Sequence, residues 1–429
     1  MIKTQKVLFG LKNYVLGVFC RYRAERHMSQ KAFKKAIRSY TKAIKTDKGD
    51  YSLYSDRGCA YLDAGMPEKA LADFNHGLRL QPDNAILHSN RGDAYAEMGK
   101  FSKAFADYER ALKLEPKSSC TYSNRGQAYV ERGDLKSALK DLNRSITLDS
   151  KNSAAYLNRG WVFFEMGDVD RALKDFQRAL KLDPKSTDIF GSLGQTYQAM
   201  QLPDKAIEQY DKIIRLEPKS GFAYNNRAML YQEKGDLLKA HADFAKAMRL
   251  SPADSGVYNN FALLMCGIKD GLKEAIHFFN AAIRLSPNNP LYLHNRGLAY
   301  LHAGKPKQAL NDFNKAIQLD PERGLGYCGR GMANVALGAL EAALQDFTQA
   351  MRWEPPSTEL YCNRAQVYSD MENYTAALAD YSSAIKVDPK CAFAYYNRGA
   401  IYQDMGRYPL AKADAAKALK LDPDIVSEE

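Results

Sequence analysis

A period of 34 residues runs through almost the whole chain and constrains its fold more than any other feature. The period is most easily seen in ten prolines, which are Pro82, Pro116, Pro184, Pro218, Pro252, Pro287, Pro321, Pro355, Pro389 and Pro423. Self-similarity at such a period is typical of repeat proteins, in which stacked neighbours bury a core that one repeat alone cannot bury. We therefore expect a repeat array, although 429 residues would normally suggest two or three globular domains.

Counting back from the prolines gives twelve repeats between an N-terminal segment, residues 1–16, and a C-terminal tail, residues 426–429. We expect residues 1–16 to be either a cap or the remnant of an earlier repeat of a longer array. The twelve repeats span 17–50, 51–84, 85–118, 119–152, 153–186, 187–220, 221–254, 255–289, 290–323, 324–357, 358–391 and 392–425. Repeat 255–289 has one extra residue, which falls between its two apolar segments, where a turn absorbs an insertion most easily.

Each repeat is predicted to be a helical hairpin. Apolar residues recur at positions 4, 8 and 11 and again at 20, 24, 27 and 28, which is helical periodicity interrupted by a turn that usually has glycine at position 15. Position 8 is Gly or Ala in all twelve repeats, and position 20 is Ala in all twelve. Because glycine inside a helix costs about 0.5–1 kcal/mol relative to alanine, its recurrence predicts that the second helix lies very close to the first.

Arginine at position 7 and aspartate at position 23 occur together in nine repeats, and only Arg23, with Ser39 in the first repeat, lacks the aspartate. The two later repeats that lack the arginine, at Leu193 and Phe261, also lack the aspartate. This joint loss predicts an ion pair between the two helices of one hairpin. The expected pairs are Arg57–Asp73, Arg91–Asp107, Arg125–Asp141, Arg159–Asp175, Arg227–Asp243, Arg296–Asp312, Arg330–Asp346, Arg364–Asp380 and Arg398–Asp414. The alternative is that these arginines bind phosphate or carboxylate groups of a ligand, but each would first have to release its aspartate.

The whole pattern resembles the tetratricopeptide repeat family, whose repeat has small residues at positions 8 and 20, aromatic residues at 11 and 24, and proline at 32. The resemblance covers residues 17–425, with Lys48 and Ser150 in place of the proline and Leu142 and Ala415 in place of the aromatic residue at position 24. It implies an all-α fold, an α-solenoid in which about twelve hairpins form a right-handed superhelix. It also implies that the first helices line a concave groove where partners bind.

Asparagine at position 6 is the main candidate for binding. It occurs at Asn90, Asn124, Asn158, Asn226, Asn260, Asn295, Asn363 and Asn397. Positions 2, 6, 9 and 13 share one face of the first helix, opposite the apolar stripe, and asparagine is a poor helix former. Its amide can donate and accept, as a peptide backbone does, and such ladders resemble those that grip bound peptides in the family. We predict an extended peptide ligand; the alternative is that the asparagines bridge neighbouring first helices.

Residues beside the asparagines indicate the kind of ligand. We expect Trp161, Phe222 and Met229 to contribute apolar contacts in the groove. Position 13 carries an acidic row, which is Asp63, Glu97, Glu131, Glu165, Glu233, Asp370 and Asp404. This row favours basic or neutral ligands in the N-terminal half, unless it is only a solvated face. Position 2 has no Lys or Arg from the second repeat onward, which disfavours the acidic C-terminal tails of chaperones that some family members bind.

No motif for catalysis is present. The seven histidines form no HExxH motif, and the seven cysteines form no CxxC pair. We therefore expect no enzyme, no cofactor and no metal site. The scattered cysteines indicate a reducing intracellular compartment, so we predict a cytoplasmic protein, and the apolar runs are too short for a signal peptide or membrane insertion.

We thus predict a scaffold for protein–protein interaction. The alternatives are an adaptor subunit of a large trafficking or ciliary assembly and, less expected, a nucleic-acid-binding protein. The net charge of +11 is compatible with nucleic acid, but the aromatic residues belong mostly to the core and the predicted groove is acidic, so no nucleic-acid partner is expected.

Overall fold

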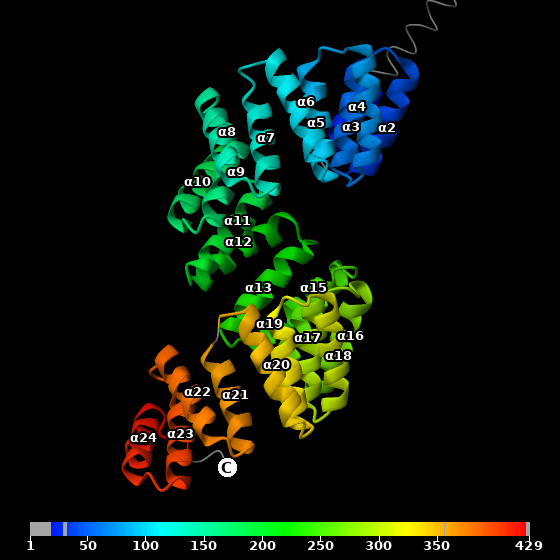
Figure 1. Cartoon of the computed structure of the whole chain (residues 1–429). Helices are drawn as coiled ribbons and strands as arrows, with labels where there is room; N and C mark the ends of the chain where they lie inside the picture. Colours follow the sequence, from blue (N-terminus) through cyan, green and yellow to red (C-terminus); the bar gives the residue numbers. More distant parts are fainter. Residues whose placement is uncertain (1–18, 29–31, 356, 426–429) are drawn as a thin grey trace, which may run out of the picture. The chain divides into compact units, whose positions relative to one another are not determined.

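The structure is a computed structural model that describes residues 19–28, 32–355 and 357–425. The predicted segments 1–16 and 426–429 therefore lie outside the described residues. Every regular element in the described part is an α-helix, and successive helices form antiparallel hairpins (Figure 1). The predicted all-α solenoid is confirmed. Among the described residues no helix is both long enough and apolar enough to cross a membrane.

The first helices begin at the predicted starts of their repeats, from Tyr51 through Ala392. Residues 19–28 form a helix that precedes α2, and the labelled helices follow it along the chain. These are α2 Phe33–Thr46, α3 Tyr51–Leu62, α4 Pro67–Leu80, α5 Ala85–Glu97, α6 Phe101–Leu114, α7 Ser119–Glu131, α8 Leu135–Leu148, α9 Ser153–Glu165, α10 Val169–Leu182, α11 Thr187–Ala199, α12 Pro203–Leu216, α13 Gly221–Glu233, α14 Leu237–Leu250, α15 Ser255–Cys266, α16 Leu272–Leu285, α17 Pro290–His302, α18 Pro306–Leu319, α19 Gly324–Ala336, α20 Leu340–Trp353, α21 Thr358–Asp370, α22 Tyr374–Val387, α23 Ala392–Asp404 and α24 Tyr408–Leu421.

The chain divides into two compact modules, an N-terminal module, Met1–Glu217, and a C-terminal module, Pro218–Glu429. Within each module a helix packs against the next helix in the chain, and neighbouring first helices also touch, as α7 does with α5 and α9. Polar residues at the ends of the helices fix the junctions. Ser118 and Asn152 accept the backbone N–H groups of the first turns of α7 and α9, and such caps contribute about 1 kcal/mol each.

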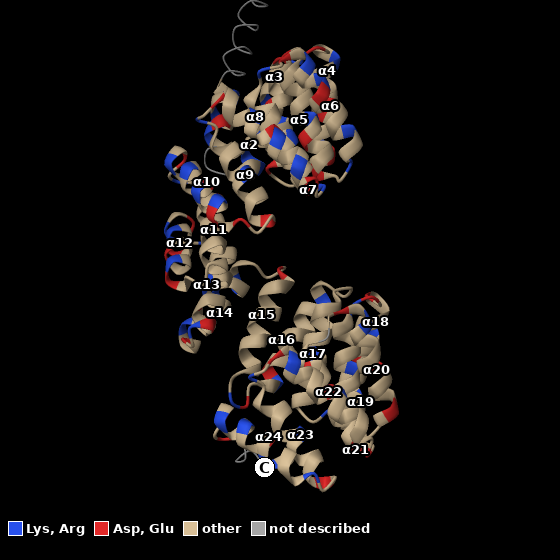
Figure 2. Cartoon of the chain, turned by 60° about the vertical axis from the view of Figure 1, so that its left-hand side comes forward, with Lys and Arg blue, Asp and Glu red and all other residues tan. Residues whose placement is uncertain are grey.

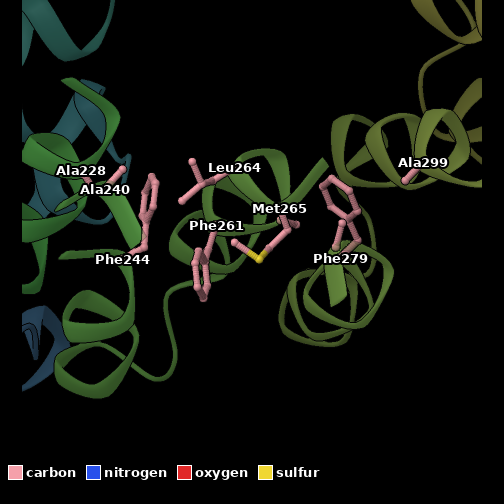
Figure 3. Close-up of a cluster of buried hydrophobic side chains, with 10 residues drawn as sticks. Ala228, Ala240, Phe244, Phe261, Leu264, Met265, Phe279 and Ala299 are labelled. Carbon is pink, nitrogen blue, oxygen red and sulfur yellow. The ribbon is translucent and has the colours of Figure 1, made fainter. Parts of the chain in front are cut away.

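In most hairpins an aromatic ring of the second helix fills the space beside the small residue at position 8, whereas Leu142 takes this place beside Gly126 and no ring lies beside Gly399. A Cβ atom added to Gly160 would lie 2.6 Å from Cε1 of Phe176, which is fully buried. In the C-terminal module, Phe244 lies among Ala228, Ala240 and the side chains of α15, and Phe279 lies between Met265 and Ala299 (Figure 3). The rings therefore join the two helices of a hairpin and also contact the following repeat.

The turn inside each described hairpin keeps one left-handed residue. Gly133 has φ 81°, and glycine takes this conformation without steric cost. Gln201, Asp270 and Glu372 adopt φ values of 57°, 61° and 58° at the same place in their repeats. The hairpin geometry is thus maintained even where a side chain makes the conformation less favourable.

All nine expected Arg–Asp pairs are present, with N···O distances of 2.6–2.7 Å. Arg159 donates Nε and Nη2 to the two carboxylate oxygens of Asp175. It also donates Nη1 to Oδ1 of Asn143, in the second helix of the preceding repeat. The arginine therefore holds three helices together, a role that the pairing within one hairpin did not predict.

Two of the three repeats without the ion pair, 187–220 and 255–289, have replaced both charged residues. Leu193 and Gln209 are both buried, and the amide of Gln209 donates to the carbonyl of Lys205 in its own helix. Phe261 instead packs against Phe278, with ring centroids 4.7 Å apart. Paired replacement of both charges is thus compatible with the same hairpin.

A Gly160→Ala substitution should lower the thermal midpoint by a few degrees. The added methyl group overlaps Phe176, and overpacking of this kind costs about 1–3 kcal/mol. The matched control is Gly399→Ala, because Ala415 replaces the ring there and the nearest atom to the new Cβ is Asp414 Cβ at 3.3 Å. The control should leave the midpoint equal or slightly higher, since alanine is the better helix former. Equal losses in both variants would contradict the ring-against-glycine account.

An Asp175→Gln substitution should destabilise the N-terminal module by about 3 kcal/mol, because it leaves the Arg159 guanidinium without its carboxylate. The double variant Arg159→Leu, Asp175→Gln reproduces the residues of the neighbouring repeat, Leu193 and Gln209. It should recover most of the loss in thermal unfolding. A double variant as unstable as the single one would show that the charges are not coupled.

Candidate peptide-binding face

The candidate site is the surface formed by positions 2, 6, 9 and 13 of successive first helices, which we name the first-helix face. In the N-terminal module it is best developed on α5, α7 and α9, of which α7 contacts both of the others. In the C-terminal module the same positions lie on the first helices from α13 onward. Each module is described by itself.

Half of the eight asparagines donate their amide to the preceding repeat. Asn124 donates Nδ2 to Oδ2 of Asp93 at 2.8 Å, and Asn295 donates to Oδ1 of Asn259 at 2.9 Å. Asn90 and Asn260 likewise donate across to the neighbouring first helix. These bonds match the alternative expectation that the asparagines bridge first helices. Among the described residues, no donor bonds Oδ1 of Asn90, Asn124 or Asn295. The predicted contact of these asparagines with a peptide would therefore use that oxygen as an acceptor.

The other four asparagines differ from one another. Asn226 and Asn397 donate back to the carbonyl of the residue four positions earlier in their own helix, at 2.8 and 2.9 Å. Asn363 has a buried Nδ2 atom without a hydrogen-bond partner. The half-buried Asn158 makes no side-chain hydrogen bond with any described residue and lines a pocket. The eight amides therefore do not form a uniform ladder.

A pocket of about 200 Å³ opens on the first-helix face across α5, α7 and α9. Its polar lining comes from the Asp93 and Glu97 carboxylates, the Tyr108 hydroxyl, and groups of Asn124, Gln127, Glu131 and Asn158. Gln127 donates Nε2 to Glu131 at 3.1 Å. No Lys or Arg lies in this lining, so the pocket has the electrostatic character that a cationic side chain would complement.

Asp93 is the most perturbed acid in this pocket. Its pKa is raised from the ordinary value of 3.8 to about 7, chiefly by burial and to a smaller extent by the carboxylates of Glu97 and Glu131. Hydrogen bonds from the Tyr108 hydroxyl, at 2.7 Å, and from Asn124 act in the opposite direction. The pKa of Glu97 is also raised, chiefly by burial. The negative charge of the pocket therefore increases as the pH rises through neutrality.

The first-helix face of the C-terminal module carries exposed apolar side chains. Phe222 is 48% exposed, Leu263 41% and Met229 37%. Asn260 contacts this group through Met229 Sδ at 3.4 Å. Phe222 and Met229 thus lie on the surface where the sequence predicts peptide contacts, and Leu263 adds to them.

Trp161 is less available than Phe222 and Met229. It is half-buried, and its ring stands edge-on to Phe164 and Phe176, with centroids 5.4 and 5.6 Å away. Its role as a groove contact stays a prediction, because the same ring already belongs to the hairpin core.

Sequence reasoning missed Asp93 and Gln127, which occupy position 9 in adjacent repeats. Later repeats have Leu or Met at this position, such as Leu298 and Met332. The change to polar residues in these two repeats was a signal that could have indicated the pocket. Among the described residues no group of three or more His, Cys, Asp and Glu side chains is arranged to hold a metal ion.

The Asp93 pKa gives a testable pH dependence of stability. Because the folded chain binds this proton more tightly than the unfolded chain, the contribution of Asp93 to stability is largest below pH 4 and falls as the pH rises toward 7. Asp93→Asn removes the titration. In thermal melts, the midpoint of the wild type should therefore fall by a few degrees relative to that of the variant between about pH 5 and pH 8. Parallel pH profiles would show that Asp93 titrates normally.

Comparison with known proteins gives the family. Models described as tetratricopeptide repeat match residues 85–118, 153–186, 290–323 and 392–425, and further models of this repeat match 209–242 and 187–220. A TPR repeat model matches 58–99, 126–167 and 366–406. No curated protein matches the sequence significantly.

Solved structures with a similar fold include a chain of the APC/C hetero-tetramer Cut9–Hcn1, with a TM-score of 0.51 and 15% identity over 96% of this chain and 95% of that chain. They also include the human IFIT1 dimer with m7Gppp-AAAA, with a TM-score of 0.51 and 14% identity over 87% and 90%. At these identities the likeness concerns the fold alone. With the repeat registers, the hairpin geometry and the family models in agreement, the chain belongs to the tetratricopeptide repeat family.

Proposed function

We propose that this chain is a non-enzymatic interaction scaffold whose first-helix face binds an extended segment of a partner protein. The observation that carries the proposal is the pocket across α5, α7 and α9, in which amide and carboxylate groups from successive repeats converge. Asn158 brings an amide without a partner among the described residues, and Glu97 and Glu131 bring carboxylates to the same pocket.

The spacing of the repeats suits an extended chain. Neighbouring packed helices lie about 8–10 Å apart, and three residues of an extended strand span about 10 Å. A peptide that crosses successive first helices therefore presents one residue in three to each repeat. The side chains at position 6 can bond backbone groups at this interval.

The asparagines alone do not supply enough free energy. A neutral hydrogen bond contributes about 0.5–1.5 kcal/mol net, whereas ordering each peptide residue costs about 1–2 kcal/mol. Hydrogen bonds between charged groups are roughly twice as strong as neutral ones. The acidic pocket of the N-terminal module therefore favours a ligand with Lys or Arg at the residue that reaches it.

The C-terminal module supports a different kind of contact. Phe222, Met229 and Leu263 offer apolar surface, and burial of such surface contributes about 25 cal/mol per Å². A partner held mainly by these side chains would correspond to the adaptor alternative, in which binding does not depend on asparagines. An oligonucleotide, as in the human IFIT1 structure, is disfavoured on the face of α5, α7 and α9 because its phosphates would meet carboxylates.

Selection from a library of random extended peptides tests the proposal. Peptides that bind the wild type should be enriched in Lys or Arg. Affinity for those peptides should fall about 10–100-fold in a Glu97→Gln, Glu131→Gln variant, because two charge-assisted contacts are lost. Isothermal titration calorimetry measures the loss.

The matched control for this experiment is Glu109→Gln, Glu208→Gln, which changes the charge equally at exposed sites on the second helices α6 and α12. Its affinity should equal that of the wild type. If the control loses as much affinity as the pocket variant, or if the selected peptides are acidic, the proposed binding face is wrong.

A further inference from the structure

The outer sides of α8 and α10 carry a dense group of cations that the first-helix face does not use. In both repeats the same three positions are basic: Lys140 and Lys174 at position 22, Arg144 and Arg178 at position 26, and Lys151 and Lys185 at position 33. Lys181 adds a further cation on α10. These seven residues are named the basic band, and all are exposed. Figure 2 shows the blue of Lys and Arg gathered around α10.

Most charges of the basic band are not neutralised by the described residues, although Lys174 lies close enough to the Asp168 carboxylate to help lower the pKa of that acid. None of its seven side chains forms an ion pair with a carboxylate among the described residues, and Arg178 only lies over the ring of Tyr156, 5.9 Å from its centroid. The aspartates of α8 and α10 that face inward, Asp141 and Asp175, are already bound to Arg125 and Arg159. Two exposed carboxylates, Asp149 and Asp183, lie in the turns after the helices.

Only the repeats of α8 and α10 have Lys or Arg at positions 22, 26 and 33 together. Position 22 is Lys or Arg only in α8 and α10 among the corresponding helices from α6 onward, where other repeats have Ala106, Glu208, Ala242, His277, Asn311, Gln345, Ala379 and Ala413. Position 26 is also basic in other repeats, at Arg110, Lys212, Lys246, Lys315 and Lys417, and position 33 is also basic at Lys117, Lys219 and Lys390. The two lysines at position 22 therefore give this adjacent pair of repeats more cations at positions 22, 26 and 33 than any other adjacent pair.

We propose that the basic band is a docking surface for anionic phospholipid headgroups, by which the protein associates with the surface of a membrane without inserting into it. Clusters of four to eight Lys and Arg residues attract anionic membrane surfaces, and each cation near the surface strengthens binding about fivefold. The basic band falls in this range and consists mainly of lysines, whose long flexible side chains reach a headgroup layer.

The arrangement of the cations favours lipid over a charged polymer. The cations are not evenly repeated on the two helices, because Asp170 on α10 and Thr147 on α8 stand at positions that are basic in the other helix. Lipids diffuse laterally and can gather beneath cations at any spacing, whereas a polymer has fixed distances between its charges. No exposed large apolar side chain lies on α8 or α10, so the basic band lacks the aromatic platforms on which single-stranded nucleic acids stack. It also lacks the apolar anchors that usually dominate a protein interface.

Sedimentation with lipid vesicles tests this surface in the full chain. The wild type should bind vesicles of phosphatidylcholine with about 30 mol % phosphatidylserine and not vesicles of phosphatidylcholine alone. Binding should weaken between about 50 mM and about 150 mM salt, because the charges are screened. The variant Lys140→Gln, Arg144→Gln, Lys174→Gln, Arg178→Gln should lose more than about tenfold in partition.

The matched control removes the same number of Lys and Arg charges from exposed sites on second helices of the C-terminal module: Arg249→Gln, Lys315→Gln, Arg352→Gln and Lys417→Gln. Circular dichroism establishes that both variants fold. The control should keep at least half of the wild-type binding. Absence of binding to the anionic vesicles at low salt, or an equal loss in the control, would overturn the proposal. So would tighter binding, per phosphate, to an RNA oligonucleotide that the basic-band variant loses.

Discussion

The close contact between a ring of the second helix and a small residue of the first helix determines how most of the hairpins are built. Where Phe176 lies against Gly160, no larger side chain fits without displacement. The contact fixes which side of the first helix faces inward. The opposite side, with positions 2, 6, 9 and 13, is then free of its own second helix and becomes the candidate binding face. The small residue at position 8 therefore has a consequence for function as well as for packing.

Polar side chains then connect the hairpins in two different ways. On the side of the second helices, arginines such as Arg159 bond an aspartate of their own repeat and an amide of the preceding one. On the side of the first helices, Asn124 and Asn295 bond polar groups of the preceding repeat. Much of the polar surface is thus already engaged in the free protein. A ligand meets carbonyl oxygens of asparagines, the carboxylates of the acidic pocket and the exposed apolar group around Met229.

The parts of the structure that could be predicted from the sequence depend on local signals or on paired ones. Proline near the repeat ends, polar caps and the turn residue are local, so the starts of the first helices agree with the structure from Tyr51 to Ala392. The Arg–Asp contacts could be predicted because Leu193 and Phe261 mark the repeats where both charges are absent. The left-handed turn at Gln201 has no glycine to signal it, yet its place in the period locates it.

The details of the candidate site could not be predicted in the same way. Whether an asparagine at position 6 bridges two helices depends on the acceptor within its reach. Asn124 donates to Asp93 of the neighbouring first helix, whereas Asn226 donates to the backbone of its own helix. The raised pKa of Asp93 depends on burial between α5, α6 and α7, which no single register encodes. The edge-on contact of Trp161 with Phe176 likewise depends on how α9 packs against α10.

The most direct test of the central claim is site-specific photo-crosslinking to a peptide selected for binding. A photoreactive residue is placed at Gln127, on the first-helix face of α7, or at Gln177, on the exposed side of α10. The account predicts that the peptide is crosslinked from position 127 and not from position 177. Crosslinking from position 177 alone would show that ligands bind the second helices, and the first-helix face would then be an element of architecture only.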